Sequence, residues 1–155
     1  MIDREMRIKR AMDFFMEGYN CSQSVVLAFA DMYGLERDVA LRLSSSFGAG
    51  MGRMRLTCGA VTGLFMLVGL ETGATDPADR EGKGRNYAEV QKVAERFKAL
   101  KGSITCSELL KLRADAPTPH MPDARTAEYY KTRPCVEMVR TAATLFCDFL
   151  EENGK

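Results

Sequence analysis

The chain has 155 residues, the usual size of one domain, and we expect a single domain over residues 1–155 whose core needs no disulfide bonds. Its 22 basic and 21 acidic side chains nearly cancel, which argues against a nucleic-acid partner because such binders usually carry a basic excess. Residues 1–12 lack the apolar stretch of an export signal, and the longest apolar segment, residues 60–70, is far shorter than the ~20 residues that span a bilayer. We therefore expect a cytoplasmic protein with no membrane partner.

Apolar residues recur at spacings of three and four along most of the chain, which predicts an all-α fold. Capping residues, glycines and prolines divide this pattern into expected helices at residues 2–17, 21–33, 37–45, 57–70, 80–100, 106–112 and 134–152. The most apolar of them, residues 57–70, is the expected central helix of a compact multi-helix bundle. A proline-rich loop, residues 114–134 with one helical turn near 126–131, precedes the last helix, and loops of this length often form lids or binding segments.

Four of the five cysteines fall at predicted helix starts. They are Cys21, Cys58, Cys106 and Cys135, and the residues expected to cap their helices are Asn20, Thr57, Thr105 and, before Pro134, Thr132. Residues 105–108 have the form of a capping box, and residues 20–23 nearly match it. The first turn of a helix stabilises a thiolate through its unpaired N–H groups and the positive end of its dipole, so we expect lowered pKa values at these thiols. Cys147 lies inside the last helix and is expected to be structural.

Several cysteines in a reducing compartment indicate redox or metal chemistry more often than structural cross-links. The chain has no Cys-x-x-Cys, which excludes the thioredoxin-type motif, the usual zinc-ribbon spacing and c-type haem attachment. Three functions stay open: a thiol oxidoreductase with an attacking and a resolving cysteine, a zinc or iron–sulfur module with all four cysteines as ligands, and a helical assembly module with purely structural cysteines. We expect the first, with Cys58 as the central thiol because its helix is the most apolar, and an unidentified redox partner.

Glycines surround the central cysteine. Gly48, Gly50 and Gly52, followed by Arg53 and Arg55, suit either a backbone nest for an anion or a tight turn that lets the next helix pack closely, and we favour the turn. Four residues separate Gly59 from Gly63, which makes one side of the central helix smooth and lets another helix approach Cys58. This smooth face and the proline-rich loop also suit a homodimer. His120, in that loop, is expected to be a solvated histidine rather than a proton donor or metal ligand.

Residues 47–70, FGAGMGRMRLTCGAVTGLFMLVGL, are the most distinctive part of the chain. With the segments around Cys21, Cys106 and Cys135 in the same order, they resemble the putative redox-active protein family named for its C_GCAxxG_C_C cysteine pattern. The resemblance implies that Cys21, Cys58, Cys106 and Cys135 are the four family cysteines and that their role is redox chemistry. Thr57 stands before Cys58 where the pattern has glycine, Gly59 follows it, and Cys147 is additional.

Overall fold

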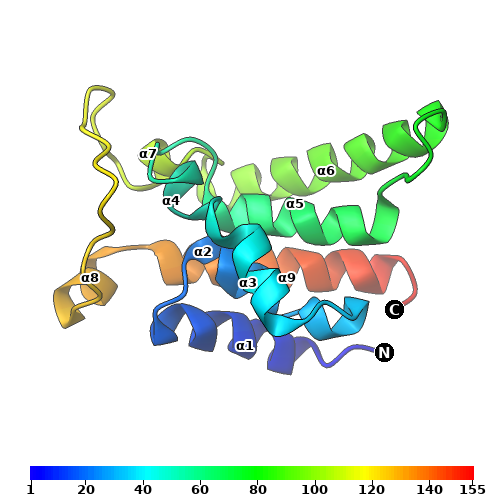
Figure 1. Ribbon diagram of the computed structural model, residues 1–155, viewed down its shortest axis with the longest axis horizontal. Helices are drawn as coiled ribbons and strands as arrows, with labels where there is room; N and C mark the ends of the chain where they lie inside the picture. Colours follow the sequence, from blue (N-terminus) through cyan, green and yellow to red (C-terminus); the bar gives the residue numbers. More distant parts are fainter.

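The computed structural model describes residues 1–155, and it is all-helical, as predicted. The elements are α1 (Arg4–Glu17), α2 (Cys21–Leu27), η1 (Ala30–Tyr33), α3 (Arg37–Ser45), α4 (Gly48–Met51), α5 (Gly59–Thr72), α6 (Arg80–Lys101), α7 (Cys106–Leu109), α8 (Ala127–Thr132) and α9 (Cys135–Glu152). The long helices α1, α5, α6 and α9 run side by side, and both chain termini lie at one end of this bundle (Figure 1).

Helix α5 is the centre of the bundle. It packs against α2, α6 and α9, and its side chains are apolar on every side, as expected for a helix surrounded by others. Val61, Leu64, Leu67 and Val68 are completely buried, and burying each side chain contributes about 1.5–3 kcal/mol to folding. The central apolar helix predicted at 57–70 is therefore confirmed, with its start two residues later, at Gly59.

The smooth face of α5 lies against α2. A Cβ atom added at Gly63 would stand 3.1 Å from the backbone oxygen of Ser22 and from the Cβ of Val25, and one added at Gly59 would stand 3.2 Å from the Cβ of Cys21. A larger residue at either position would push the two helices apart. This confirms that the two glycines allow a neighbouring helix to approach the start of α5.

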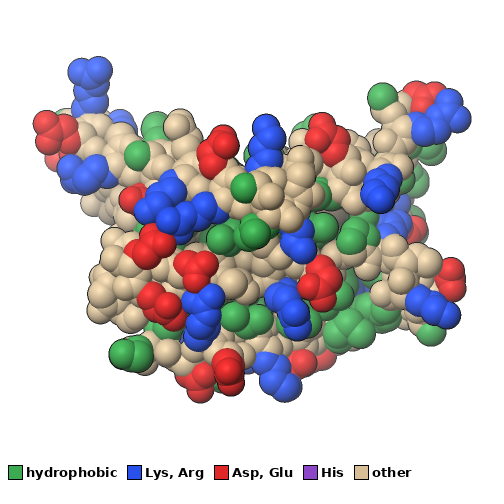
Figure 2. Space-filling model, turned by 180° about the vertical axis from the view of Figure 1, so that it is seen from behind, with side chains coloured by type: hydrophobic (Ala, Val, Ile, Leu, Met, Phe, Trp, Pro, Cys, Tyr) green, Lys and Arg blue, Asp and Glu red, His purple; other side chains and the backbone are tan.

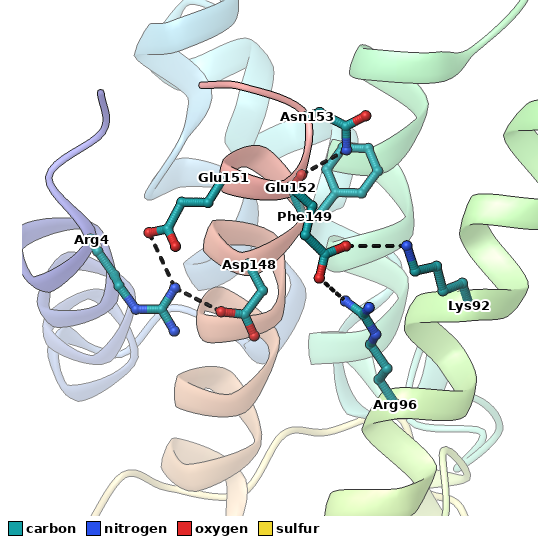
Figure 3. Close-up of polar contacts among 8 residues, drawn as sticks. All are labelled: Arg4, Lys92, Arg96, Asp148, Phe149, Glu151, Glu152 and Asn153. Atoms are coloured by element: carbon teal, nitrogen blue, oxygen red, sulfur yellow. Dashed lines mark hydrogen bonds and ion pairs between the residues drawn. The ribbon is translucent and has the colours of Figure 1, made fainter.

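Charged side chains hold the outer helices to α9 at its C-terminal end. Arg4 of α1 pairs with Asp148 at 2.7 Å, while Lys92 and Arg96 of α6 pair with Glu152 at 3.1 and 2.8 Å (Figure 3). All of these side chains are about a third or more exposed, so each pair contributes at most about 1 kcal/mol. Their main effect is to fix the rotation of α1 and α6 about α9.

Two predicted helices are interrupted. The helix expected at 21–33 breaks after Leu27, because the turn there lets Phe29 pack on Phe146, 4.8 Å between ring centroids, while Ala30 enters a second small apolar cluster. The helix expected at 106–112 ends at Leu109, just before Lys111 takes a left-handed backbone conformation. The first break serves a contact between distant segments, which the local apolar period does not encode.

Residues 114–134 lie at the end of the bundle opposite the two termini, next to α4 and α7 (Figure 1). Only α8 within them is helical, and we call residues 114–134 the cover segment. The face of the molecule that lies behind the view of Figure 1 carries interspersed acidic and basic side chains (Figure 2). No helix combines the length and the apolar character required to cross a bilayer.

Candidate thiol site

The four cysteines at helix starts meet in one cavity. Cys21, Cys106 and Cys135 are the first residues of α2, α7 and α9, and Cys58 is the residue just before α5. All four line a cavity of about 100 Å³ at the end of the bundle under the cover segment. Cys21, Cys58 and Cys106 are 5–7% exposed, and Cys135 is half-buried. We call this space the thiol cavity.

Asn20 positions Cys21. Its side-chain oxygen accepts the backbone N–H of Gln23 at 2.9 Å, and the Gln23 side chain accepts the N–H of Asn20 at 3.1 Å, so the near match to a capping box forms a real one. The Asn20 amide also donates to the carbonyl of Ser45 at 3.0 Å. Asn20 therefore joins the start of α2 to the end of α3, and this contact together with the capping box fixes the backbone at Cys21.

A short antiparallel pairing positions Cys58 and Cys106. Thr57 and Thr105 form an isolated β-bridge, in which the N–H of Cys58 donates to Ile104 at 2.8 Å and that of Cys106 to Leu56 at 2.6 Å. Because side chains alternate along extended backbone, both cysteines project to the same side, away from the two threonines. This pairing places the starts of α5 and α7 next to each other.

Two of the expected caps are wrong and a third is correct only in position. Cys58 itself occupies the N-cap of α5, so Thr57 lies one residue before it. Thr105 is the N-cap of α7, as expected, but its side chain makes no capping bond, and the Glu108 carboxylate accepts from Ser103, so the expected capping box does not form. Thr132 belongs to α8, and Pro134 occupies the N-cap of α9. The signal for the true role of the threonines was the repeated apolar-Thr-Cys sequence at residues 56–58 and 104–106, which suits extended backbone.

The glycine-rich stretch is a left-handed turn that closes over Cys106. Residues 49–53 all have φ between 55° and 72°, and only Gly50 and Gly52 among them are free of the steric cost of that conformation. A Cβ at Gly50 would lie 2.6 Å from the Cβ of Cys106 and 2.6 Å from the Cα of Arg55. The tight-turn interpretation is confirmed, since glycine here lets the turn contact the cysteine directly.

Cys21 and Cys135 shift each other's pKa in opposite directions. Hydrogen bonding from the Cys21 thiol lowers the pKa of Cys135 to about 7, while the same interaction, followed by burial, raises the pKa of Cys21. Arg133, the Tyr129 hydroxyl and Arg125 also lower the pKa of Cys135. Of the pair, Cys135 is therefore the sulfur that carries the negative charge at neutral pH.

The other two thiols are not activated. Burial raises the pKa of Cys58 to about 12 and outweighs the opposing effect of the N–H groups of Ala60 and Val61. Burial also raises the pKa of Cys106, although the Arg55 guanidinium lies 3.7 Å from its sulfur and acts in the opposite direction. The expectation of lowered pKa values at all four helix starts is correct only for Cys135. At Cys58 and Cys106 burial outweighs the nearby N–H groups and the Arg55 guanidinium, and at Cys21 the interaction with Cys135 is the larger cause, followed by burial.

Arginines surround the thiol cavity. Arg53, Arg55, Arg125 and Arg133 line it, together with a single acidic residue, Asp123. Arg53 and Arg133 both pair with Asp123. Arg125, Arg133 and Tyr129 were not predicted as site residues, because a proline-rich segment gives no local sign of which part of the fold it packs against.

Three residues attach the cover segment to the bundle. Arg125 donates to the carbonyls of Phe15 and Tyr19, both at 2.8 Å, and its guanidinium lies 4.2 Å from the centre of the Phe15 ring. Tyr130 donates to Met16 at 3.2 Å, and Arg53 donates to Pro119 at 2.9 Å. The segment therefore lies over the cavity and supplies part of its wall.

The remaining candidates lie outside the cavity. Cys147 is completely buried in the main apolar core, as expected for a structural cysteine. His120 is exposed and does not line the cavity. No group of three or more histidine, cysteine or carboxylate side chains is arranged to hold a metal ion, so the four sulfurs do not form a ready ligand set.

These features define a helical protein in which four of the five cysteines line one buried, positively charged cavity. The sequence model of the family described as Putative redox-active protein (C_GCAxxG_C_C) matches residues 19–149, and the chain belongs to this family. The match spans all four cavity cysteines. Comparison with curated proteins and with solved structures found no match.

Proposed function

We propose that the protein carries out thiol–disulfide exchange, with Cys135 as the attacking thiol and Cys21 as the resolving thiol. The observation that carries this proposal is that Cys21 and Cys135 line one cavity, which the starts of separate helices build, and that their pKa values shift in opposite directions. An attacking thiol works best when its pKa is close to the ambient pH, and only Cys135 meets this condition. The description of the family as redox-active supports the same chemistry.

The reaction balances with two thiols and one disulfide. The Cys135 thiolate attacks one sulfur of the disulfide, forms a mixed disulfide and releases the other half as a thiolate. The Cys21 thiol then loses its proton to that thiolate and attacks the Cys135 sulfur, which releases the second half as a thiolate. The products are a Cys21–Cys135 disulfide, one released thiol and one released thiolate, and the protein has given up two electrons.

The metal and assembly alternatives have weaker support. A zinc site needs sulfurs ~2.3 Å from one centre, whereas the cysteines here are not arranged as ligands. Cys21 and Cys58 belong to the same apolar core as Cys147, as structural cysteines would. Unlike Cys147, however, they line a cavity together with Cys106, Cys135 and four arginines, an environment suited to ionised sulfur.

Intact mass after alkylation tests the proposal. The reduced protein is treated with a small disulfide, quenched in acid and alkylated, and metal content is measured on the fresh protein. We expect loss of two alkylation sites and a peptide pair linked through Cys21 and Cys135. The C21S variant should accumulate a mixed disulfide on Cys135, C135S should lose the reaction, and C147A should behave as the wild type. Alkylation of every cysteine after the disulfide treatment would refute the proposal.

A further inference from the structure

We propose that the thiol cavity selects a small disulfide that carries a carboxylate, rather than a neutral or cationic disulfide or one in a folded protein. This inference rests on the proposed thiol–disulfide exchange and names its substrate class. Four arginines and one aspartate line the cavity, a charge of +3 before any thiol ionises, whereas the whole chain carries only +1. The positive charge is therefore concentrated at the thiols.

Two of the four arginines lack a carboxylate partner. Asp123 is shared by Arg53 and Arg133, so it neutralises only one of these two charges. Arg125 donates to backbone carbonyls and the Tyr130 hydroxyl, and the only hydrogen-bond acceptor of Arg55 is the Cys106 sulfur. A planar guanidinium can donate two parallel hydrogen bonds to one carboxylate. Arg55 still has free N–H donors and can therefore bind the carboxylate of a substrate.

The size of the cavity indicates a small substrate. About 100 Å³ accommodates on the order of six non-hydrogen atoms, enough for one half of a small thiol compound. Pro122 and Asp123 of the cover segment form part of its wall, and Cys21 is only 7% exposed. A disulfide on a folded protein would have to displace this segment to reach the sulfurs, whereas a small molecule would not.

Three small disulfides with the same two-methylene spacer between sulfur and polar group test the selectivity: dithiodipropionate, which is anionic, dithiodiethanol, which is neutral, and cystamine, which is cationic. The rate of Cys21–Cys135 disulfide formation is measured with each and divided by the rate of the same compound with dithiothreitol. We expect the anionic compound to react about tenfold faster than the cationic one at low salt, with the difference shrinking as the salt concentration rises.

Substitution of Arg55 tests the residue. In R55Q the rate of disulfide formation should fall about tenfold with the anionic compound and change by no more than about twofold with the neutral one. R55K should keep most of the preference for the anionic compound. R85Q, at an exposed arginine of α6 that makes no ion pair, is the matched control, and thermal melting checks the fold of each variant.

The two proposals fail differently. The selectivity would be overturned by equal normalised rates for the three compounds, by faster reaction with cystamine, or by an R55Q variant that still prefers the anionic compound. Each of these results would leave thiol–disulfide exchange in place. Absence of reaction with all three would overturn the exchange itself and, with it, the substrate class.

Discussion

Cys21 at the start of α2 and Cys135 at the start of α9 line the same cavity and shift each other's pKa in opposite directions. Hydrogen bonding from the Cys21 thiol favours negative charge at Cys135, so the pKa of Cys135 falls to about 7 while Cys21 keeps its proton. A nucleophile and a resolving thiol need this asymmetry.

The alkylation of Cys135 should follow a lowered pKa. Its reaction with iodoacetamide should rise with pH and reach half its maximum near pH 7, about the pKa of this thiol. C21A removes the hydrogen-bond donor and should move the midpoint upward, toward the value of an ordinary cysteine. C21S keeps a hydroxyl donor and should move it less. Peptide mass spectrometry measures each rate, and an unchanged midpoint in C21A would show that Cys21 does not lower the pKa of Cys135.

Cys58 should make the protein sensitive to alkaline pH. Its pKa is raised from 9.0 to about 12, so the unfolded chain releases this proton first, and the free energy of unfolding falls as the pH rises between these values. One such group contributes a slope of up to about 1.4 kcal/mol per pH unit. Urea unfolding of the wild type and C58A across this range should therefore give a shallower decline for C58A. Parallel curves would show that Cys58 does not titrate in this way.

Gly50 should be much less replaceable than Gly52, although both have a positive φ. G50A introduces a Cβ 2.6 Å from Cys106 and from the backbone of Arg55, whereas a Cβ at Gly52 meets nothing within 4 Å. We expect G52A to cost about 1–2 kcal/mol for the left-handed conformation alone. G50A should cost about 3 kcal/mol or more, because the turn must also move away from the cavity. Urea unfolding gives both values, and equal costs would argue against the close contact.

Loss of Arg125 should expose the cavity. R125A removes two charge-assisted hydrogen bonds to Phe15 and Tyr19, so the cover segment should open more often and the alkylation of Cys106 should accelerate about tenfold. The control is R113A, because Arg113 is 86% exposed and pairs only with Asp115. Hydrogen exchange over residues 119–134 should increase in R125A alone. The same exchange in both variants would mean that Arg125 does not hold the segment.

The cap at Asn20 should matter more than the one expected at Thr105. N20A removes a capping box and a bond to Ser45, and should destabilise the protein by about 1–2 kcal/mol. T105A removes no capping bond, so its cost should stay near about 0.5 kcal/mol. Thermal or urea unfolding distinguishes them. A larger loss in T105A would indicate that the Thr57–Thr105 bridge depends on the threonine side chain.

The sequence by itself determined the long helices α1, α5, α6 and α9, the central position of α5 and the cysteines worth studying. These features depend on local patterns: the apolar period, the smooth Gly59–Gly63 face, and the Asn20 cap, whose partner Gln23 lies three residues away. It also separated Cys147 from the other four cysteines, because an interior position on an apolar face is visible from spacing alone.

Only the tertiary structure decided that four helix starts open into one cavity and which thiol is acidic. The Thr57–Thr105 bridge joins segments far apart in the chain, and Arg133 and Tyr129 reach Cys135 from the cover segment. Cys58 was expected to be the central thiol because its helix is the most apolar, but burial beside that helix raises its pKa. The pKa of Cys135 is low because of its neighbours, among them Cys21 and Arg133. A pKa is set by hydration and nearby charges, and both depend on residues that only folding brings together.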